Sequence, residues 1–131
     1  MSKFSIVCVD DEKIILDSLK TQLRSIFGNA YSYEIAEDAQ EAFELIEELV
    51  QDKTKVLLVI SDYIMPGMYG DEFLIRLHEK HPEIKKILLT GQANEKAIDQ
   101  MREQAELLFC IRKPWTAREL ESMIRKGLDA E

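Results

Sequence analysis

The chain has 131 residues, 46% of them hydrophobic and 32% charged, which predicts one globular domain over residues 1–131. The net charge of −8 argues against direct nucleic-acid binding and against anionic membranes, since both favour basic surfaces. No apolar run is long enough to span a bilayer and no signal peptide is recognisable, so we expect a cytoplasmic protein.

Five apolar runs alternate along the chain with five stretches of helical periodicity. The expected strands are Phe4–Val9, Tyr31–Ala36, Val56–Ser61, Ile84–Thr90 and Leu107–Arg112. The expected helices are Lys13–Phe27, Asp38–Val50, Gly70 to the residue before Pro82, Asn94–Gln104 and Thr116–Leu128. This alternation predicts right-handed βαβ units and a parallel sheet covered on both faces. Because an α/β barrel needs about twice this length, we expect a flavodoxin-like (βα)5 three-layer sandwich with strand order 2-1-3-4-5.

Polar residues follow the apolar strands at the points where the strands end. Asp10 and Asp11 follow the first strand, Asp62 the third and Lys113 the fifth, while Thr90 closes the fourth. Because the carboxyl ends of parallel strands open on one rim, we expect these side chains to converge. Three converging carboxylates repel one another unless a hard cation lies among them. The pattern therefore predicts a Mg²⁺ site, since Mg²⁺ prefers oxygen ligands and is often completed by a substrate phosphate.

The same residues predict phosphoryl transfer to Asp62. An aspartate carboxylate is a nucleophile for phosphate and gives an acyl phosphate. The Lys113 ammonium and the Thr90 hydroxyl would contact the phosphoryl oxygens, and Gly91 leaves room for the group to approach the backbone. In the alternative, the acidic residues only favour a helix start, Thr90 is a simple helix-capping or strand-end residue, and Lys113 is a surface residue.

Four segments carry a resemblance to a known family: Val9–Glu12, Asp62–Leu74, Leu89–Gly91 and Lys113–Pro114. Each segment alone is weak, but together and at these strand ends they resemble the receiver domain of response regulators in bacterial two-component systems. The resemblance covers essentially the whole chain, as a single receiver domain. It implies a phosphoprotein that takes its phosphoryl group from a sensor histidine kinase or a histidine phosphotransfer protein.

The resemblance also implies roles for individual residues. Asp62 is the phosphoacceptor, and Lys113 and Thr90 contact the phosphoryl group. The implied Mg²⁺ ligands are Asp11 and Asp62 directly, Asp10 largely through water, and the backbone carbonyl of Ile64. The bond between Lys113 and Pro114 is expected to be cis, as proline permits.

One position departs from the family pattern. Receivers switch when the threonine moves toward the phosphate and an aromatic residue on the fifth strand repacks. That residue lies three places before the lysine, where this chain has Cys110, and Phe109 is one place earlier. Either a bulge brings Phe109 into the role or the coupling to Thr90 is altered, which we favour.

The resemblance further implies how the phosphoryl group is hydrolysed and which surface binds a partner. Ile64 and Gln92 flank the path of the attacking water, and the apolar Ile64 predicts slow hydrolysis. The face made by the fourth helix, the fifth strand and the fifth helix is the expected surface for a homodimer or an output partner. The chain is either a stand-alone receiver or the amino-terminal piece of a longer regulator, and the Lys113–Trp115 ending favours the second slightly.

Three other functions are compatible with parts of the sequence. A haloacid-dehalogenase-type phosphatase also uses an aspartyl phosphate, but it expects a second aspartate where this chain has Ile64. A flavodoxin-like cofactor binder conflicts with the acidic loop after the first strand, which repels phosphate. An inert receiver-like binding module is the remaining alternative. We expect no enzyme in the usual sense, only a protein that catalyses its own phosphorylation and dephosphorylation.

Two residue types outside the rim have simpler interpretations. Cys8 and Cys110 fall in separate apolar strands, so we expect inert thiols without a disulfide. His78 and His81 lie near the end of a charged helix and are expected to be solvated surface residues.

Overall fold

A computed structural model describes residues 3–129 of the chain. The strands are β1 (Phe4–Val9), β2 (Ser32–Ala36), β3 (Lys55–Ser61), β4 (Lys85–Thr90) and β5 (Phe109–Arg112). The helices are α1 (Lys13–Phe27), α2 (Ala39–Gln51), α3 (Gly70–Lys80), α4 (Glu95–Gln104) and α5 (Ala117–Asp129), with a short 3-10 helix η1 (Gly28–Ala30). Every expected element is present, with ends that differ by at most two residues.

The largest difference lies at the start of β5, which begins at Phe109 rather than at Leu107. The Leu107 amide donates to the Met101 carbonyl and so closes the end of α4. Glu106 has a positive φ of 51°, which turns the chain out of the helix. The two leucines are apolar like a strand but belong to this helix end and the connection after it.

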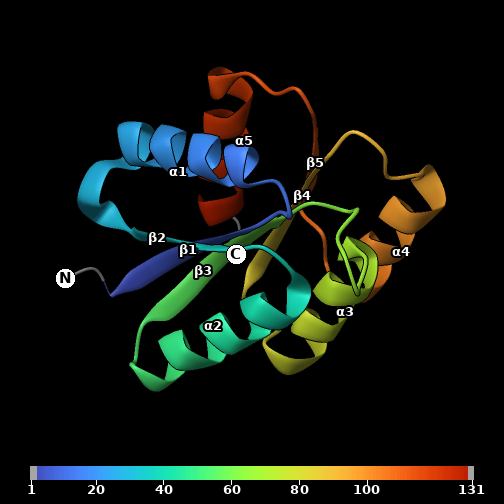
Figure 1. Cartoon of the computed structure of the whole chain (residues 1–131), viewed down its shortest axis with the longest axis horizontal. Coiled ribbons are helices and arrows are strands. Elements are labelled where there is room, and N and C mark those ends of the chain that lie inside the picture. The colour runs from blue at the N-terminus through green and yellow to red at the C-terminus, as the bar shows by residue number, and fades with distance from the viewer. Residues whose placement is uncertain (1–2, 130–131) are drawn as a thin grey trace.

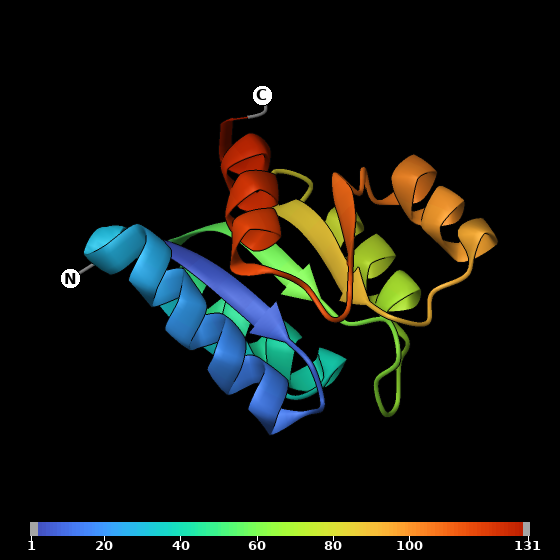
Figure 2. The same cartoon turned by 90° about the horizontal axis from the view of Figure 1, so that it is seen from above.

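The five strands form one parallel sheet in the order β2-β1-β3-β4-β5, which confirms the expected flavodoxin-like topology. Helices α1 and α5 cover one face, and α2, α3 and α4 cover the other (Figure 1). The same three layers are visible from above (Figure 2). None of the described helices is both long enough and apolar enough to cross a membrane.

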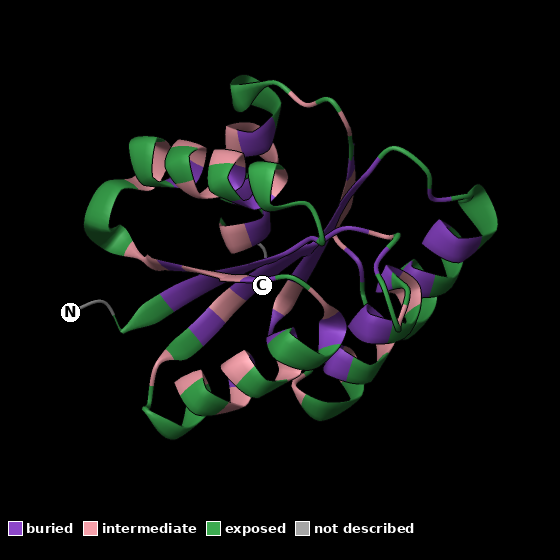
Figure 3. Cartoon of the chain, viewed as in Figure 1, coloured by how far each residue is buried: buried purple, intermediate pink, exposed green. Residues whose placement is uncertain are grey.

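The core has two parts, one on each face of the sheet. Alternate residues of a strand point to opposite faces, so Val7, Val59 and Leu88 pack under α2, α3 and α4. Ile6 and Ile60 pack under α1 and α5. The central strands are buried on both sides (Figure 3), which explains why they have no polar alternation. Their carboxyl ends lead charged groups, among them Asp10 and Asp62, into a shared space.

The register of β5 decides between the two explanations for its unusual sequence. Ile87 pairs with Phe109 and Leu88 pairs with Cys110, and the ladder between β4 and β5 contains no bulge among the described residues. Phe109 packs on the α1–α5 side of the sheet, whereas Cys110 packs on the α3–α4 side. Thr90 shares the face of Leu88 by alternation. The register thus places Cys110, not Phe109, on the face of Thr90, and the bulge explanation is excluded.

The expectation that both histidines are solvated is wrong. His81 Nε2 lies 2.8 Å from Glu47 Oε1, and His78 Nδ1 lies 3.0 Å from Lys86 Nζ. His81 pairs with Glu47 of α2. For His78 the reason is Lys86, which occupies a core-facing position of β4 and has only 1% of its surface exposed. The cation must find its partners inside the protein, and His78 is one of them. Both cysteines are free, as expected.

Candidate functional site

The site begins where β1 and β3 end side by side. The Asp10 amide donates to the Ala36 carbonyl and the Asp62 amide donates to the Val9 carbonyl, across 3.1 and 2.9 Å. These bonds continue the sheet ladder one residue past each strand. The backbone of both aspartates is therefore held in place by hydrogen bonds to neighbouring strands. Both carboxylates are also buried. A fixed backbone makes the relative position of the two carboxylates a property of the fold.

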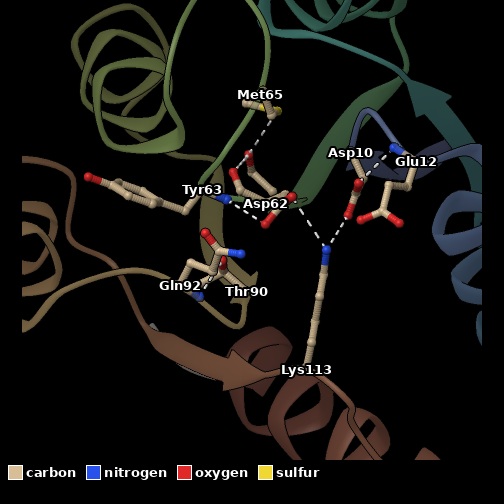
Figure 4. Close-up of polar contacts among 9 residues, drawn as sticks. Asp10, Glu12, Asp62, Tyr63, Met65, Thr90, Gln92 and Lys113 are labelled. Atoms are coloured by element: carbon tan, nitrogen blue, oxygen red, sulfur yellow. Dashed lines mark hydrogen bonds and ion pairs between the residues drawn. The ribbon is translucent and has the colours of Figure 1, made fainter.

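Lys113 lies between the two carboxylates. Its Nζ is 2.8 Å from Asp10 Oδ2 and 3.3 Å from Asp62 Oδ2 (Figure 4). The Lys113 amide donates to the Thr90 carbonyl, so the lysine leaves the sheet directly beside the end of β4. The peptide bond between Lys113 and Pro114 is cis, as expected. The residue that follows β5 thus places its ammonium group beside Asp10 and Asp62.

The remaining carboxylate oxygens accept hydrogen bonds from backbone amides. Asp10 Oδ1 accepts from the Glu12 amide at 2.9 Å, and Asp62 Oδ1 accepts from the Tyr63 amide at 2.8 Å. In each aspartate one oxygen is held by the local backbone and the other faces Lys113 (Figure 4). This arrangement fixes the rotation of both side chains.

Burial and the neighbouring charges shift the pKa values of two groups in the site, Asp10 and Lys113. Burial raises the pKa of the Asp10 carboxyl, and the hydrogen bonds from Lys113 and from the Glu12 amide offset part of that rise. For Lys113, burial lowers the pKa, but the bond to Asp10 and the charges of Asp10 and Asp62 outweigh it, so the pKa is raised. The ammonium is therefore retained by the carboxylates that it neutralises.

A pocket of about 390 Å³ opens above this cluster. Its lining contains seven of the expected site residues, together with Glu12: Asp11, Asp62, Ile64, Thr90, Gly91, Gln92 and Lys113. Asp10 lies beneath it as a buried residue, and neither Phe109 nor Cys110 lines it. The pocket joins the loops after β1, β3, β4 and β5.

Thr90 is the last residue of β4 and is 2% exposed. Its Oγ1 accepts a hydrogen bond from the Gln92 amide at 3.2 Å, which leaves the hydroxyl hydrogen to donate elsewhere. The N-cap of α4 is Asn94, whose side chain accepts from the Ala97 amide. The alternative in which Thr90 caps this helix is therefore excluded.

Three carboxylates fit a divalent cation by their chemistry. Asp10, Asp11 and Asp62 each offer one oxygen, and these oxygens lie within 4.8 Å of one another. Hard oxygen donors that are this close suit Mg²⁺. Asp11 is exposed toward solvent while Asp62 is buried, so the cluster reaches from the pocket floor to water.

Two residues beside Asp62 were not singled out from the sequence. Gly70 begins α3, and a Cβ at this position would lie 2.3 Å from the Asp62 carbonyl oxygen. Only glycine allows α3 to start this close to the acidic loop. Ser61 is fully buried at the end of β3 and donates to the Asp62 carbonyl. No signal in the sequence marks a serine of this kind, because serine is common at strand ends.

Comparisons with known proteins show the family of the chain. A family model described as the response regulator receiver domain matches residues 6–125. The signal receiver domain of an HD domain-containing protein from Pseudomonas fluorescens Pf-5 is 31% identical, with a TM-score of 0.84 over 98% of this chain and 89% of that one. A CheY-like response regulator receiver domain protein from Methanospirillum hungatei JF-1 is 32% identical, with a TM-score of 0.84 over 98% of this chain and 95% of that one.

A curated relative extends the comparison to a larger protein. The sensor kinase CckA from Brucella abortus (strain 2308) is 29% identical over 109 residues, which are 83% of this chain. The chain spans only 11% of that relative's length.

Proposed function

Because the chain belongs to the response regulator receiver family of two-component signalling, we propose that it accepts a phosphoryl group on Asp62 in a Mg²⁺-dependent reaction and thereby changes its surface for a downstream partner. One observation carries the proposal. Asp10, Asp11 and Asp62 converge within 4.8 Å, and Lys113 Nζ bridges two of them. Such a group of carboxylates around one ammonium is costly to bury for stability alone.

The chain's own residues prepare the transfer. A phosphohistidine is the proposed donor: its P–N bond breaks, the imidazole nitrogen keeps the electron pair, and a new O–P bond forms to the Asp62 carboxylate. The Tyr63 amide holds Asp62 Oδ1 and so orients the nucleophile. Lys113 supplies a positive charge 3.3 Å from Asp62 Oδ2, beside the place where phosphoryl charge collects. A bound Mg²⁺, held by Asp10, Asp11, Asp62 and the Ile64 carbonyl, would add charge neutralisation.

The partners follow from the same proposal. The donor is a sensor histidine kinase or a histidine phosphotransfer protein, and one relative is itself named a sensor kinase. The downstream partner that recognises the phosphorylated state is proposed to bind the face of α4, β5 and α5. Within β5, Cys110 lies on the same face of the sheet as Thr90. A second copy of the chain is the other occupant of this face. With Cys110 at that position, we propose that the threonine movement repacks a small side chain rather than a ring.

The competing functions explain the residues less well. The position that would hold the second aspartate of a haloacid-dehalogenase-type phosphatase is Ile64, 37% exposed at the rim of the pocket. An apolar side chain cannot act as a general acid. An inert module would leave the buried acidic pair and its lysine without a use.

Intact mass spectrometry after incubation with acetyl phosphate tests the proposal. We expect one phosphoryl adduct with Mg²⁺ and none after the metal is removed with EDTA. The three carboxylates repel an anionic donor, so the metal is required for approach. A wild-type protein that takes no phosphoryl group under either condition would refute the proposed function, and an adduct that ignores EDTA would refute its metal dependence.

The lifetime of the adduct provides a separate prediction. Ile64 lines the pocket and cannot hold a water by a hydrogen bond, so we expect an acyl phosphate that outlasts the scale of seconds in Mg²⁺. Ile64→Asn introduces an amide that can orient the attacking water, and we expect about tenfold faster hydrolysis, which is the rate equivalent of about one hydrogen bond. Decay of the mass adduct after removal of acetyl phosphate measures both rates. An equal lifetime in the two proteins would contradict the role of Ile64.

A further inference from the structure

Ser61 is a buried polar residue for which the proposed reaction names no role. It is the last residue of β3, directly before Asp62, and its surface is fully buried. Its hydroxyl donates to the Asp62 carbonyl oxygen across 2.8 Å and lies 4.0 Å from Met65 Sδ. Burying a hydroxyl is costly unless its hydrogen bond is made. Here that bond goes to the backbone of the proposed nucleophile.

The bond acts on one peptide group, the one that joins Asp62 to Tyr63. The carbonyl of this group accepts from Ser61, and its N–H donates to Asp62 Oδ1 at 2.8 Å. A peptide group is planar, so holding the carbonyl at one end fixes the direction of the N–H at the other. The Ser61 hydroxyl therefore sets the angle at which the Tyr63 amide meets the Asp62 carboxylate.

The neighbouring peptide groups are held by other elements. The Asp62 amide is bonded to Val9 of β1 at 2.9 Å, and the Tyr63 carbonyl accepts from the Gly70 amide of α3 at 2.7 Å. Between these two anchors, the hydrogen bond to the Asp62 carbonyl comes from Ser61. Once Oδ1 is occupied by the Tyr63 amide, Oδ2 is the oxygen that faces Lys113 at 3.3 Å.

On the premise of the proposed function, we propose that Ser61 is a positioning residue. Its hydroxyl fixes the peptide group between Asp62 and Tyr63, and this group turns the Asp62 carboxylate so that one oxygen faces Lys113 and the pocket. Ser61 touches no reacting atom and acts through the backbone alone.

Ser61→Ala and Ser5→Ala form a matched pair of variants. Ser5 is also fully buried, and it donates to the Ser32 carbonyl at 3.2 Å near the start of β1. Each variant loses one serine-to-carbonyl hydrogen bond, so we expect similar losses of stability. Only Ser61→Ala should move the Tyr63 amide proton resonance upfield in the NMR spectrum. Only in this variant should the phosphorylation rate at saturating Mg²⁺ and acetyl phosphate fall. We expect a decrease of about fivefold to tenfold, which is the rate equivalent of one hydrogen bond.

Ser61→Thr distinguishes the effect of the hydroxyl group from the effect of side-chain packing. It keeps the donor, and we expect it to retain the Tyr63 amide resonance and most of the wild-type rate. The proposal is overturned if Ser61→Ala leaves the Tyr63 resonance in place, if it slows the reaction no more than Ser5→Ala, or if Ser61→Thr slows it as much as alanine. The Tyr63 amide resonance is measured on the unphosphorylated protein. A wild type that takes no phosphate would thus refute the proposed function, while the spectra still show whether Ser61 holds this peptide group.

Discussion

Asp62→Asn is expected to abolish the phosphoryl adduct while the protein stays folded. An amide of nearly the same shape replaces the carboxylate, and an amide is not a nucleophile for phosphorus. The substitution also removes one of three negative charges that lie within 4.8 Å, so repulsion in the cluster falls. Lys113 keeps its 2.8 Å contact with Asp10. We therefore expect thermal unfolding at or above the wild-type temperature and no mass increase with acetyl phosphate and Mg²⁺.

Two further aspartates give the controls. Asp71 lies in the first turn of α3, where its carboxylate accepts from the Glu72 amide, and Asp71→Asn should phosphorylate like the wild type. Asp11→Asn removes an exposed carboxylate of the cluster and should raise the Mg²⁺ concentration required, without changing which residue carries the phosphate. An adduct that survives in Asp62→Asn would assign the phosphate to another aspartate. Peptide mapping of the wild-type adduct would then identify that residue.

The convergence of the site was predictable because strand order follows from rules that the sequence obeys. Short apolar runs alternating with helices permit few parallel topologies, and in this one the strands that end in Asp10, Asp62 and Thr90 are successive neighbours. Once the order is known, residues that follow the strands must meet at one rim. The cis bond before Pro114 was expected only from the family resemblance, since spacing and periodicity carry no information on a single peptide bond.

The residues that could not be predicted depend on packing between distant segments. Whether Phe109 or Cys110 faces Thr90 depends on the β4–β5 register, which the structure shows to be regular. The need for glycine at position 70 depends on how closely α3 approaches Asp62. The expectation that His78 is solvated fails because nothing in the sequence shows that Lys86 turns inward beneath α3. For His81 it fails because nothing in the sequence shows that α2 brings Glu47 beside it. A lysine within an apolar strand is usually an edge or surface residue.

Lys86→Met is expected to stabilise the protein at neutral pH. Lys86 Nζ donates to the Ile84 carbonyl at 2.5 Å and contacts His78 Nδ1, yet only 1% of the residue's surface is exposed. Burial lowers the pKa of Lys86 from 10.5 to about 8, and the negative charges of Glu106 and Glu83 offset only part of this effect. Burying the charged amine therefore lowers the free energy of unfolding. Methionine fills a similar volume without charge, and such replacements are often stabilising.

Both the size and the sign of this stability change depend on pH. Below pH 8 the amine is protonated in both states, and its displaced pKa corresponds to a cost of at most about 3.4 kcal/mol. Between pH 8 and 10.5 the unfolded chain binds more protons than the folded one, so the wild type gains stability as pH rises. Allowing for the lost hydrogen bonds, we expect Lys86→Met to gain about 1–2 kcal/mol at pH 7.

Urea unfolding at pH 7 and again near pH 10 measures both parts of this expectation. The advantage of Lys86→Met should shrink as pH rises and then reverse, because the neutral lysine keeps hydrogen bonds to Ile84 and His78 that methionine lacks. Lys85→Met, at the half-exposed neighbouring position of β4, controls for removing a cation from this strand. A Lys86→Met variant that is less stable than the wild type at pH 7 would mean that the contacts with Ile84 and His78 outweigh the cost of burial. A constant difference across this pH range would mean that the amine is not displaced from its ordinary pKa.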